Sequence, residues 1–268
     1  MRWRPRSMCK ADGFASTGTR SFEMKWGVVT LFPDMVESAL SHGVIGRGLR
    51  DELLELATFN PRDHATDVHQ SVDDRPYGGG PGMLMQVETL RAAIAEAKQQ
   101  LPSAPVVYLS PQGEPLKQSL VTELASGPEL ILIAGRYEGI DERVIALDVD
   151  REISLGDFVL SGGEPAAIAV LDAVGRLVPG VLGSHESANQ DSFSAGLLDH
   201  PHYTRPERID GHEVPEVLLS GHHERIAQWR RKQALGRTWQ RRPDLLAQLE
   251  LSSDDKALLE EFKKESKP

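Results

Sequence analysis

The amino-acid sequence predicts an α/β fold followed by a smaller helical region, and three observations support this. Short apolar runs rich in β-branched residues end at glycine or proline, as buried strands do. Amphipathic stretches with helical spacing separate these runs. After residue 200 the remaining periodic segments are all helical. A length of 268 residues is enough for one large domain or for two ordinary ones.

The N-terminal half alternates strands with helices. Residues 1–23 lack apolar periodicity, and we interpret them as a disordered extension or a misplaced start, so that the folded protein begins near Met24. The elements expected next are a buried strand at 26–32 stopped by Pro33, helices at about 34–40 and 46–56, a long polar loop at 60–86 and an amphipathic helix at 87–100.

The pattern continues to about residue 180 and then changes. We expect a strand at 106–109 with a turn at 110–113, a helix at about 115–125, a strand at 130–134 and a buried helix at 166–174. Residues 180–199 are small, polar and poorly periodic, which is typical of a linker. Three helices follow, at 221–236, at 243–250 and up to about Lys264, the last with Ser252 as N-cap and Asp255 as its third-position acid.

Composition excludes several classes of protein. No apolar stretch approaches the roughly 18 residues that span a bilayer, so we expect no membrane contact. The single cysteine, Cys9, excludes an internal disulfide framework and a cysteine-based zinc site, which fits a reducing cytoplasm. The net charge is −10, yet residues 200–243 hold nine Lys/Arg against five Asp/Glu, a local charge of +4. That stretch is either a phosphate-binding patch or a solvated helix face.

Two glycine-punctuated turns are the strongest sign of a ligand site. We call residues 135–143 the first glycine turn and residues 155–165 the second, and each follows a strand-like apolar run. Such a turn lets an α/β protein bring bare backbone to a ligand at a strand end. Two of them within 35 residues suggest a single site built from adjacent loops.

Other candidate motifs are weaker. The glycine loop Gly78–Gly82 lacks the Lys and Ser/Thr of a nucleotide P-loop, which argues against nucleotide hydrolysis. We interpret His200 and His202 as ordinary loop histidines, because a proline separates them and no third ligand is evident. Glu138, Asp141 and Glu142 are either general bases or Mg²⁺ ligands, or they simply pair with Arg136 and Arg143.

Asp191 also has two interpretations. It lies in the middle of the expected linker, and a mobile loop that orders over substrate commonly carries a catalytic acid or base. Alternatively, it is the N-cap of a short helix at 192–198. The residues alone leave both open.

Long ordered runs of the chain resemble one family, the bacterial tRNA (guanine-N1)-methyltransferases (TrmD). The runs that carry the resemblance are 72–83, 109–113, 135–143, 156–164, 191–193, 202–206 and 218–223. Residues 1–23 have no counterpart. The resemblance implies a trefoil-knotted SPOUT methyltransferase domain at 24–182, a flexible interdomain linker at 183–199 and a small all-helical tRNA-binding domain at 200–268. Two departures stand out, because Phe158 replaces a frequent Tyr and Pro165 is displaced by one position.

The resemblance also implies the cofactor and the residues that hold it. The cofactor is S-adenosylmethionine, and the family is dependent on Mg²⁺, for which Glu138 is the only candidate ligand we can name. The implied cofactor-binding residues are Tyr108, Leu109, Ser110, Pro111, Gly135, Tyr137, Glu138, Leu155, Gly156, Asp157, Phe158, Val159, Leu160, Gly162 and Gly163.

The implied reaction is methylation of N1 of the guanine directly 3′ of the anticodon. Asp191 matches the family's general base, and Arg176 matches the cation that stabilises charge on O6. Arg136, Asp199, His202 and Arg205 are implied to bind tRNA. The enzyme is expected to be a cytoplasmic homodimer with its active site at the subunit interface. The rivals are a non-catalytic RNA-binding protein and a SPOUT enzyme that acts on ribosomal RNA or on ribose.

Overall fold

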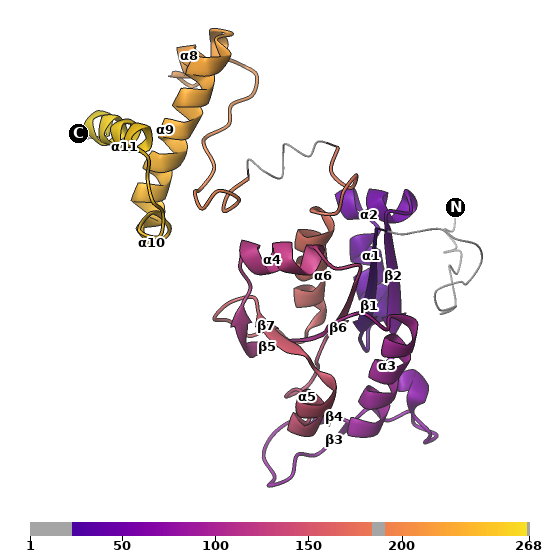
Figure 1. Cartoon of the computed structure of the whole chain (residues 1–268). Helices are drawn as coiled ribbons and strands as arrows, with labels where there is room; N and C mark the ends of the chain where they lie inside the picture. Colours follow the sequence, from indigo (N-terminus) through magenta and orange to yellow (C-terminus); the bar gives the residue numbers. More distant parts are fainter. Residues whose placement is uncertain (1–22, 184–190, 267–268) are drawn as a thin grey trace. The chain divides into compact units, whose positions relative to one another are not determined.

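The structure is a computed structural model that describes residues 23–183 and 191–266. The chain divides into two compact units between Gly183 and Ser184 (Figure 1), and each is described here by itself. Most of the expected N-terminal extension, and residues 184–190 of the expected linker, lie outside the described residues.

The first unit is built on a five-stranded parallel sheet with strand order β2-β1-β6-β5-β7. The strands are β1 (Met24–Val29), β2 (Leu54–Phe59), β5 (Val106–Pro115), β6 (Glu129–Ile133) and β7 (Arg151–Ser154). The central strands β1 and β6 are almost continuously buried, as parallel strands covered on both faces must be. The prediction of an α/β fold is confirmed.

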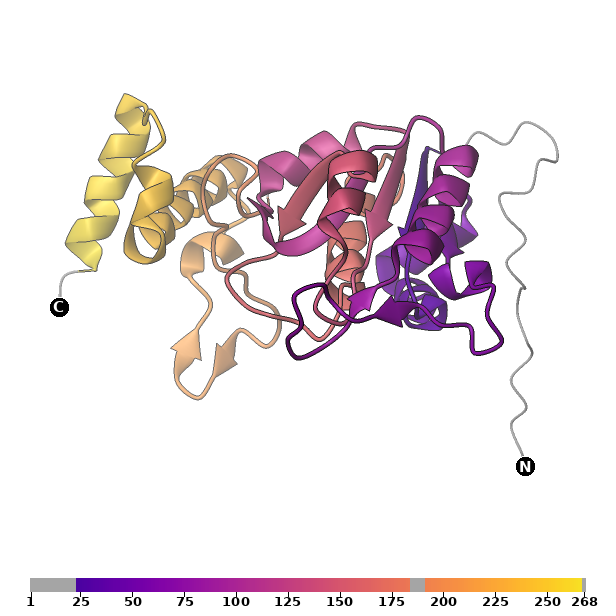
Figure 2. The ribbon, with the colours of Figure 1, turned by 90° about the horizontal axis from the view of Figure 1, so that it is seen from below.

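Helices cover both faces of this sheet (Figure 1, Figure 2). On one face Trp26 and Val28 pack with α1 (Pro33–Leu40), α2 (Gly43–Arg50), α4 (Gln118–Ala125) and α6 (Glu164–Gly175). On the other face Val29 packs with α3 (Val87–Gln100) and α5 (Glu142–Asp148). Successive residues of β1 therefore pack into two separate hydrophobic cores, because the side chains of a strand alternate between the two faces of the sheet.

The segment after α2 differs from the prediction of one helix over 46–56. Helix α2 ends at Arg50, and Leu54–Phe59 forms the edge strand β2 in register with β1. The break lies at Glu52, whose φ of 59° is left-handed and cannot continue a helix. Backbone pairing with β1 and burial of Leu54 outweigh local helix propensity here.

The polar segment 60–86 and the turn at 110–113 also hold more structure than expected. The former contains a 3₁₀ helix η1 (Pro61–His64) and a hairpin of β3 (Asp73–Asp74) and β4 (Leu84–Met85). Residues 110–113 form a bulge inside β5, since Ile153 pairs with both Leu109 and Glu114. The helix expected at 87–100 is confirmed.

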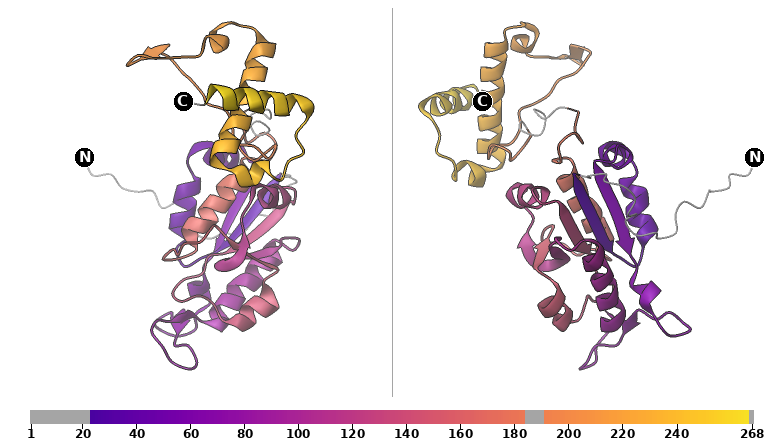
Figure 3. Two further views of the ribbon diagram at one scale, coloured as in Figure 1. Left: turned by 90° about the vertical axis from the view of Figure 1, so that its left-hand side faces the viewer. Right: turned by 45° about the vertical axis from the view of Figure 1, so that its right-hand side comes forward.

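The second unit consists of turns, a hairpin and helices. Its elements are β8 (Arg208–Ile209), β9 (His212–Glu213), α8 (Glu216–Leu219), α9 (His223–Arg241), α10 (Pro243–Leu246) and α11 (Ser253–Glu265). Helices α9 and α11 pack closely (Figure 3). The approach is so close at Gly236 that a Cβ there would lie 2.3 Å from the ring of Phe262. The predicted cap is confirmed, since Ser252 Oγ accepts a hydrogen bond from the Asp255 amide at 3.1 Å.

Helix α9 starts two residues later and ends five residues later than predicted, and α10 stops at Leu246 rather than at residue 250. Within residues 23–183 and 191–266, none of the helices is both long enough and apolar enough to cross a membrane.

Candidate active site

A cavity of about 210 Å³ lies beside the bulge of β5 and the carboxyl ends of β6 and β7. We call it the glycine-turn pocket, because both glycine turns line it. Its lining residues are Tyr108, Leu109, Ser110, Pro111, Gly135, Arg136, Tyr137, Glu138, Gly139, Ile153, Ser154, Leu155, Gly156, Phe158, Val159, Leu160, Gly162, Gly163 and Ala166. The fold therefore brings together three segments that are far apart in sequence.

The lining includes every residue expected to bind the cofactor except Asp157. Asp157 lies at the apex of a tight turn in which the Phe158 amide donates to the Gly156 carbonyl at 2.9 Å, and its side chain is exposed. Sequence reasoning missed Gly139, Ile153, Ser154 and Ala166, although all four are close neighbours of residues that it did select.

Glycine is required where the two turns touch. The Gly163 amide donates to the Gly135 carbonyl at 2.8 Å. A Cβ on Gly163 would lie 2.6 Å from the Ala134 Cα, and one on Gly135 would lie 2.9 Å from the Tyr108 ring. Only hydrogen fits in these gaps. The pocket is thus shaped by main-chain contact between its two turns.

The side chains around the pocket are largely apolar and accessible. Phe158, Val159 and Leu160 are 54%, 85% and 41% exposed, and Tyr137 is half exposed with a left-handed φ of 61°. Burial and the charge of Glu152 raise the pKa of the Tyr108 hydroxyl, so this ring stays neutral. Exposed backbone beside aliphatic and aromatic groups is suited to a flat heteroaromatic ligand.

Arg136, which was expected to bind tRNA, is directed at a buried carboxylate. Its Nε lies 2.7 Å from Glu164 Oε2, and the Glu164 side chain is fully buried at the start of α6. Thr30 Oγ1 donates to the other carboxylate oxygen at 2.7 Å. The displaced Pro165 falls in the first turn of α6, where a missing N–H costs no helical hydrogen bond.

Arg176 lies at the other end of the same helix. It is the C-cap of α6, whose twelve residues begin at Glu164, directly after the pocket-lining Gly163. At 1.5 Å rise per residue the helix is about 18 Å long. Arg176 is not among the residues that line the glycine-turn pocket, so a single copy of the first unit does not place it there.

Asp191 belongs to the second unit, where it lines a cavity of about 310 Å³ together with Asp199, His200, Arg230 and Arg231. Residues 191–197 form consecutive turns in which the Ser194 amide donates to the Asp191 carbonyl. The alternative prediction of a helix at 192–198 is therefore wrong. The turn is tied to α9, because the Leu198 amide donates to Thr238 Oγ1 at 2.9 Å.

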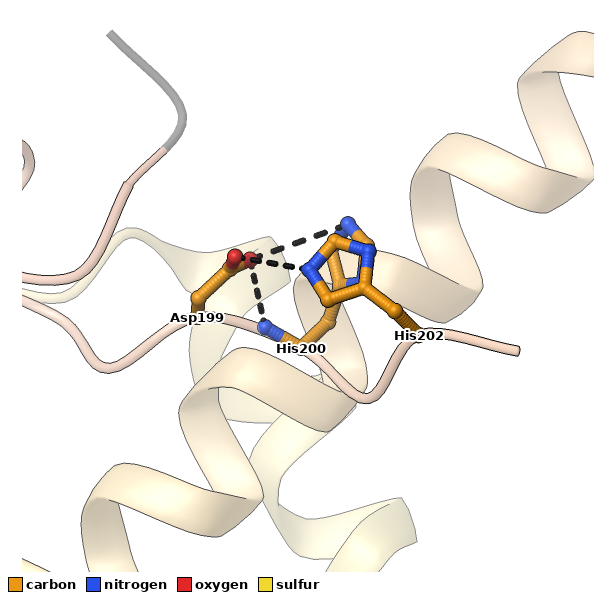
Figure 4. Close-up of side chains that lie close together, drawn as sticks. All are labelled: Asp199, His200 and His202. Atoms are coloured by element: carbon orange, nitrogen blue, oxygen red, sulfur yellow. Dashed lines mark hydrogen bonds and ion pairs between the residues drawn. The ribbon is translucent and has the colours of Figure 1, made fainter. Parts of the chain in front are cut away.

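Asp199, His200 and His202 form a compact cluster (Figure 4), and their potential ligand atoms lie within 4.8 Å of one another. Asp199 is thus a potential third ligand beside the two histidines, contrary to the prediction that they have none. Both Asp199 oxygens are already engaged, however, by the His200 amide at 2.7 Å and by His202 Nε2 at 2.8 Å. Burial opposes these bonds, yet they hold the pKa of Asp199 below its usual value. Hydrogen bonding alone explains this cluster.

The only cluster of three potential metal ligands in the described parts of the chain is that one, and it does not include Glu138. Glu138 instead lies against Gly82, and its amide donates to the Met83 carbonyl at 2.9 Å. The described residues around Glu138 therefore do not fit a Mg²⁺ site, and we derive no step through that ion.

A second cavity of the second unit, of about 510 Å³, is lined by basic, imidazole and aromatic side chains. We call it the basic cavity, and its lining residues are His200, Pro201, His202, Tyr203, Thr204, Arg205, Glu207, Val214, Leu218, Leu219, Ile226 and Arg230. Elsewhere the basic stretch is partly neutralised, because Arg231 pairs with Asp255 at 2.8 Å and Lys232 with Glu261 at 2.8 Å. Ion pairing therefore accounts for part of this basic stretch, and a phosphate-binding role for the residues of the basic cavity stays a prediction.

Comparison with known proteins gives a consistent result. Residues 24–248 match the model of the family described as tRNA (Guanine-1)-methyltransferase TrmD. A tRNA (guanine-N(1)-)-methyltransferase of Aeromonas hydrophila is 60% identical over 240 residues, covering 89% of this chain and 96% of the relative. Proteins of the same name from Marinomonas sp. and Coxiella burnetii are each 58% identical, covering 91% and 90% of this chain and 97% and 98% of the relatives.

Proposed function

Because this chain belongs to the TrmD family of tRNA (guanine-1)-methyltransferases, we propose that it methylates N1 of the guanine immediately 3′ of the anticodon, with S-adenosylmethionine as donor. That it is a tRNA (guanine-N1)-methyltransferase follows from relatives about 60% identical over most of the chain. The donor, the position and the residue roles are our proposal. The single observation that carries the choice of donor is the glycine-turn pocket, which is lined by all of the residues expected to bind the cofactor except Asp157.

The pocket fits S-adenosylmethionine. Main-chain groups of both glycine turns would hydrogen-bond the adenine edge, while Phe158 and Leu160 would cover its faces. When bound, the cofactor supplies a sulfonium methyl group whose departure leaves a neutral thioether, so no general acid is needed. We propose that the turns form part of a trefoil knot of the SPOUT type.

Two side chains would perform the proton chemistry. Guanine N1 carries a weakly acidic proton, and Asp191 would remove it before or during attack on the methyl group. An ordinary carboxylate is too weak a base to do this alone. Arg176 would therefore stabilise the negative charge that develops on O6 as the proton leaves.

A homodimer would complete this site. Arg176 lies at the opposite end of α6 from the pocket, about a helix length of 18 Å away. We propose that the pocket of one copy meets Arg176 and the Asp191 segment of a second copy across their interface. This arrangement would explain why Arg176 does not line the pocket of its own chain.

The second unit would hold the tRNA, as a helical RNA-binding domain joined by a linker. Arg205 and His202, which line the basic cavity, would contact phosphate, and the ring of Tyr203 would stack on a base. The target guanine lies in a loop, so its edge is reached without opening a duplex. With tRNA as its substrate, the enzyme would act in the cytoplasm.

The test is a methyl-transfer assay with labelled S-adenosylmethionine and two tRNA transcripts that differ only in having guanine or adenine after the anticodon. We expect label only in the guanine transcript and only at N1 of that base. Label at another position, on ribose, or in ribosomal RNA instead of tRNA would contradict the proposal and favour a different SPOUT activity.

A further inference from the structure

A buried ionic network connects four segments of the first unit at the glycine-turn pocket. Glu164 at the start of α6 is fully buried. One of its oxygens accepts from Thr30 Oγ1 and the other faces Arg136 Nε, both at 2.7 Å. Arg136 Nη1 donates to the Ser161 carbonyl at 3.4 Å. The network thereby joins the end of β1, the first glycine turn, the second glycine turn and α6.

The guanidinium of Arg136 fills the space between the two turns. A Cβ on Gly162 would lie 2.3 Å from Arg136 Nε, so the second turn packs directly on this side chain. On its other side the guanidinium carbon lies 4.3 Å from the centroid of the Phe32 ring, a cation–π distance. Only 18% of the Arg136 side chain is exposed. Contacts on several sides hold it away from bulk solvent and leave little of it for tRNA.

The charge of this pair makes its two members interdependent. A fully buried carboxylate is stable only with a cation or hydrogen-bond donors beside it. Removing Arg136 would leave the buried Glu164 carboxyl without its cation, and the start of α6 would have to move to let in water. That movement would separate the second turn from the first, whose direct link is the bond from the Gly163 amide to the Gly135 carbonyl.

We propose that Arg136 and Glu164 are positioning residues that hold the two glycine turns in the spacing that binds the methyl donor, and that Arg136 does not bind tRNA. This inference rests on the proposed function of the pocket. It assigns a task to a buried carboxylate that the methyl-transfer chemistry does not use, and it replaces the tRNA-binding role that the sequence suggested for Arg136.

The experiment compares Arg136→Met, Glu164→Gln and the double variant for binding of S-adenosylmethionine and of tRNA. Each single variant should weaken cofactor binding by about tenfold or more, because it breaks a buried pair. Binding of tRNA should stay within about twofold of wild type. The double variant should be no worse than the worse single variant, since both charges are gone together. Arg136→Lys, which keeps the charge, should recover part of the affinity.

Kinetics supply a second readout that a general loss of structure would not give. The KM for S-adenosylmethionine should rise while the KM for tRNA stays constant. Arg143→Met is the matched control, because Arg143 lies on the same turn but is 68% exposed and pairs with Asp141. This control should bind both ligands as wild type does.

Three outcomes would overturn the inference. Weakened tRNA binding with normal cofactor binding in Arg136→Met would restore the tRNA-binding role. Additive losses in the double variant would show that the two residues act separately. Loss of cooperative unfolding in Glu164→Gln and Arg136→Lys would show a role in the whole fold rather than in the pocket. If wild type itself bound no S-adenosylmethionine, the proposed function would fail, which is a distinguishable result.

Discussion

The glycine-turn pocket and the basic cavity are built in opposite ways. The pocket is shaped by main chain, since its two turns touch through Gly135 and Gly163 with no room for a Cβ. The basic cavity is shaped by side chains carried on loops and on α9, among them Tyr203, Arg205 and Arg230. A backbone-built pocket should fail abruptly when one atom is added, whereas a side-chain cavity should lose affinity gradually as groups are removed.

The chemistry follows the same division. In our proposal the pocket holds the donor and contributes no proton transfer, and the second unit contributes the base. In this proposal each region can therefore be damaged without harming the other.

Substitution of the base should have the largest effect. Asp191→Asn keeps the shape of the side chain but cannot accept the N1 proton, so kcat should fall by about 10²- to 10⁴-fold. Affinity for S-adenosylmethionine, measured by calorimetry, should not change. Asp210→Asn in the exposed turn between β8 and β9 is the control and should be fully active. A fully active Asp191→Asn enzyme would remove the base from our mechanism.

Removal of the proposed O6 cation comes next. Arg176→Gln should lower kcat by about 10²- to 10³-fold, because the charge on O6 loses its partner in the transition state. Rapid-mixing single-turnover assays would separate this loss from slower product release. Since Arg176 is distant from the pocket of its own chain, cofactor affinity should stay normal. An Arg176→Gln enzyme that lost cofactor binding but kept its kcat would contradict the proposed role of Arg176 and show that it acts on the pocket instead.

Addition of one methyl group to the pocket should weaken donor binding sharply. In Gly163→Ala the new Cβ would lie 2.6 Å from the Ala134 Cα, so the two turns must separate. We expect about tenfold or greater loss of S-adenosylmethionine affinity and about 1–3 kcal/mol of destabilisation. Gly127→Ala is the matched control, because its nearest neighbours would be 3.8 Å away. Equal losses in both variants would contradict a backbone-built pocket.

This difference in construction also explains how much the sequence could predict. The glycines and the apolar runs before them predict a ligand site at adjacent strand ends, and the residues implied by the family resemblance include most of the pocket lining. The β2 strand was mistaken for helix because its pairing with β1 is a long-range contact that no local pattern records. The bulge at Ser110–Gly113 looked like a terminal turn for the same reason, since only the register with Ile153 shows that β5 continues.

Side-chain partners were the least predictable feature. The family resemblance implies that Arg136 binds tRNA, and nothing in the local sequence indicates that it pairs with Glu164, 28 positions later. Likewise Asp199 joins His200 and His202 only through the conformation of their loop. In the second unit the charge pattern does not indicate which basic residues are paired, because the acidic partners of Arg231 and Lys232 lie on α11.

In the basic cavity, removal of one arginine should weaken tRNA binding gradually. Arg205→Ala should lower affinity about three- to tenfold and reduce the slope of log affinity against log salt by about one. Arg208→Ala is the matched control, because Arg208 is 69% exposed and lies 3.5 Å from Glu213 in the β8–β9 hairpin. Filter binding at several salt concentrations measures both. Identical losses would indicate diffuse attraction by net charge rather than a defined cavity.

The smallest effect concerns pH and the Asp199 cluster. Hydrogen bonds from His202 and from the His200 amide outweigh burial and keep the folded pKa of Asp199 below its unfolded value, so the carboxylate stabilises the fold above about pH 4. This stabilisation should disappear as pH falls through the folded pKa. The difference in unfolding free energy between wild type and Asp199→Asn should be about 1 kcal/mol or less at pH 7 and shrink toward pH 3 in urea titrations. The difference in unfolding free energy between wild type and His202→Gln should have the same sign but be smaller, because the hydrogen bond from the His200 amide to Asp199 remains. If the difference in unfolding free energy did not change with pH, the Asp199 cluster would stabilise the fold through packing and not through the charge of the carboxylate.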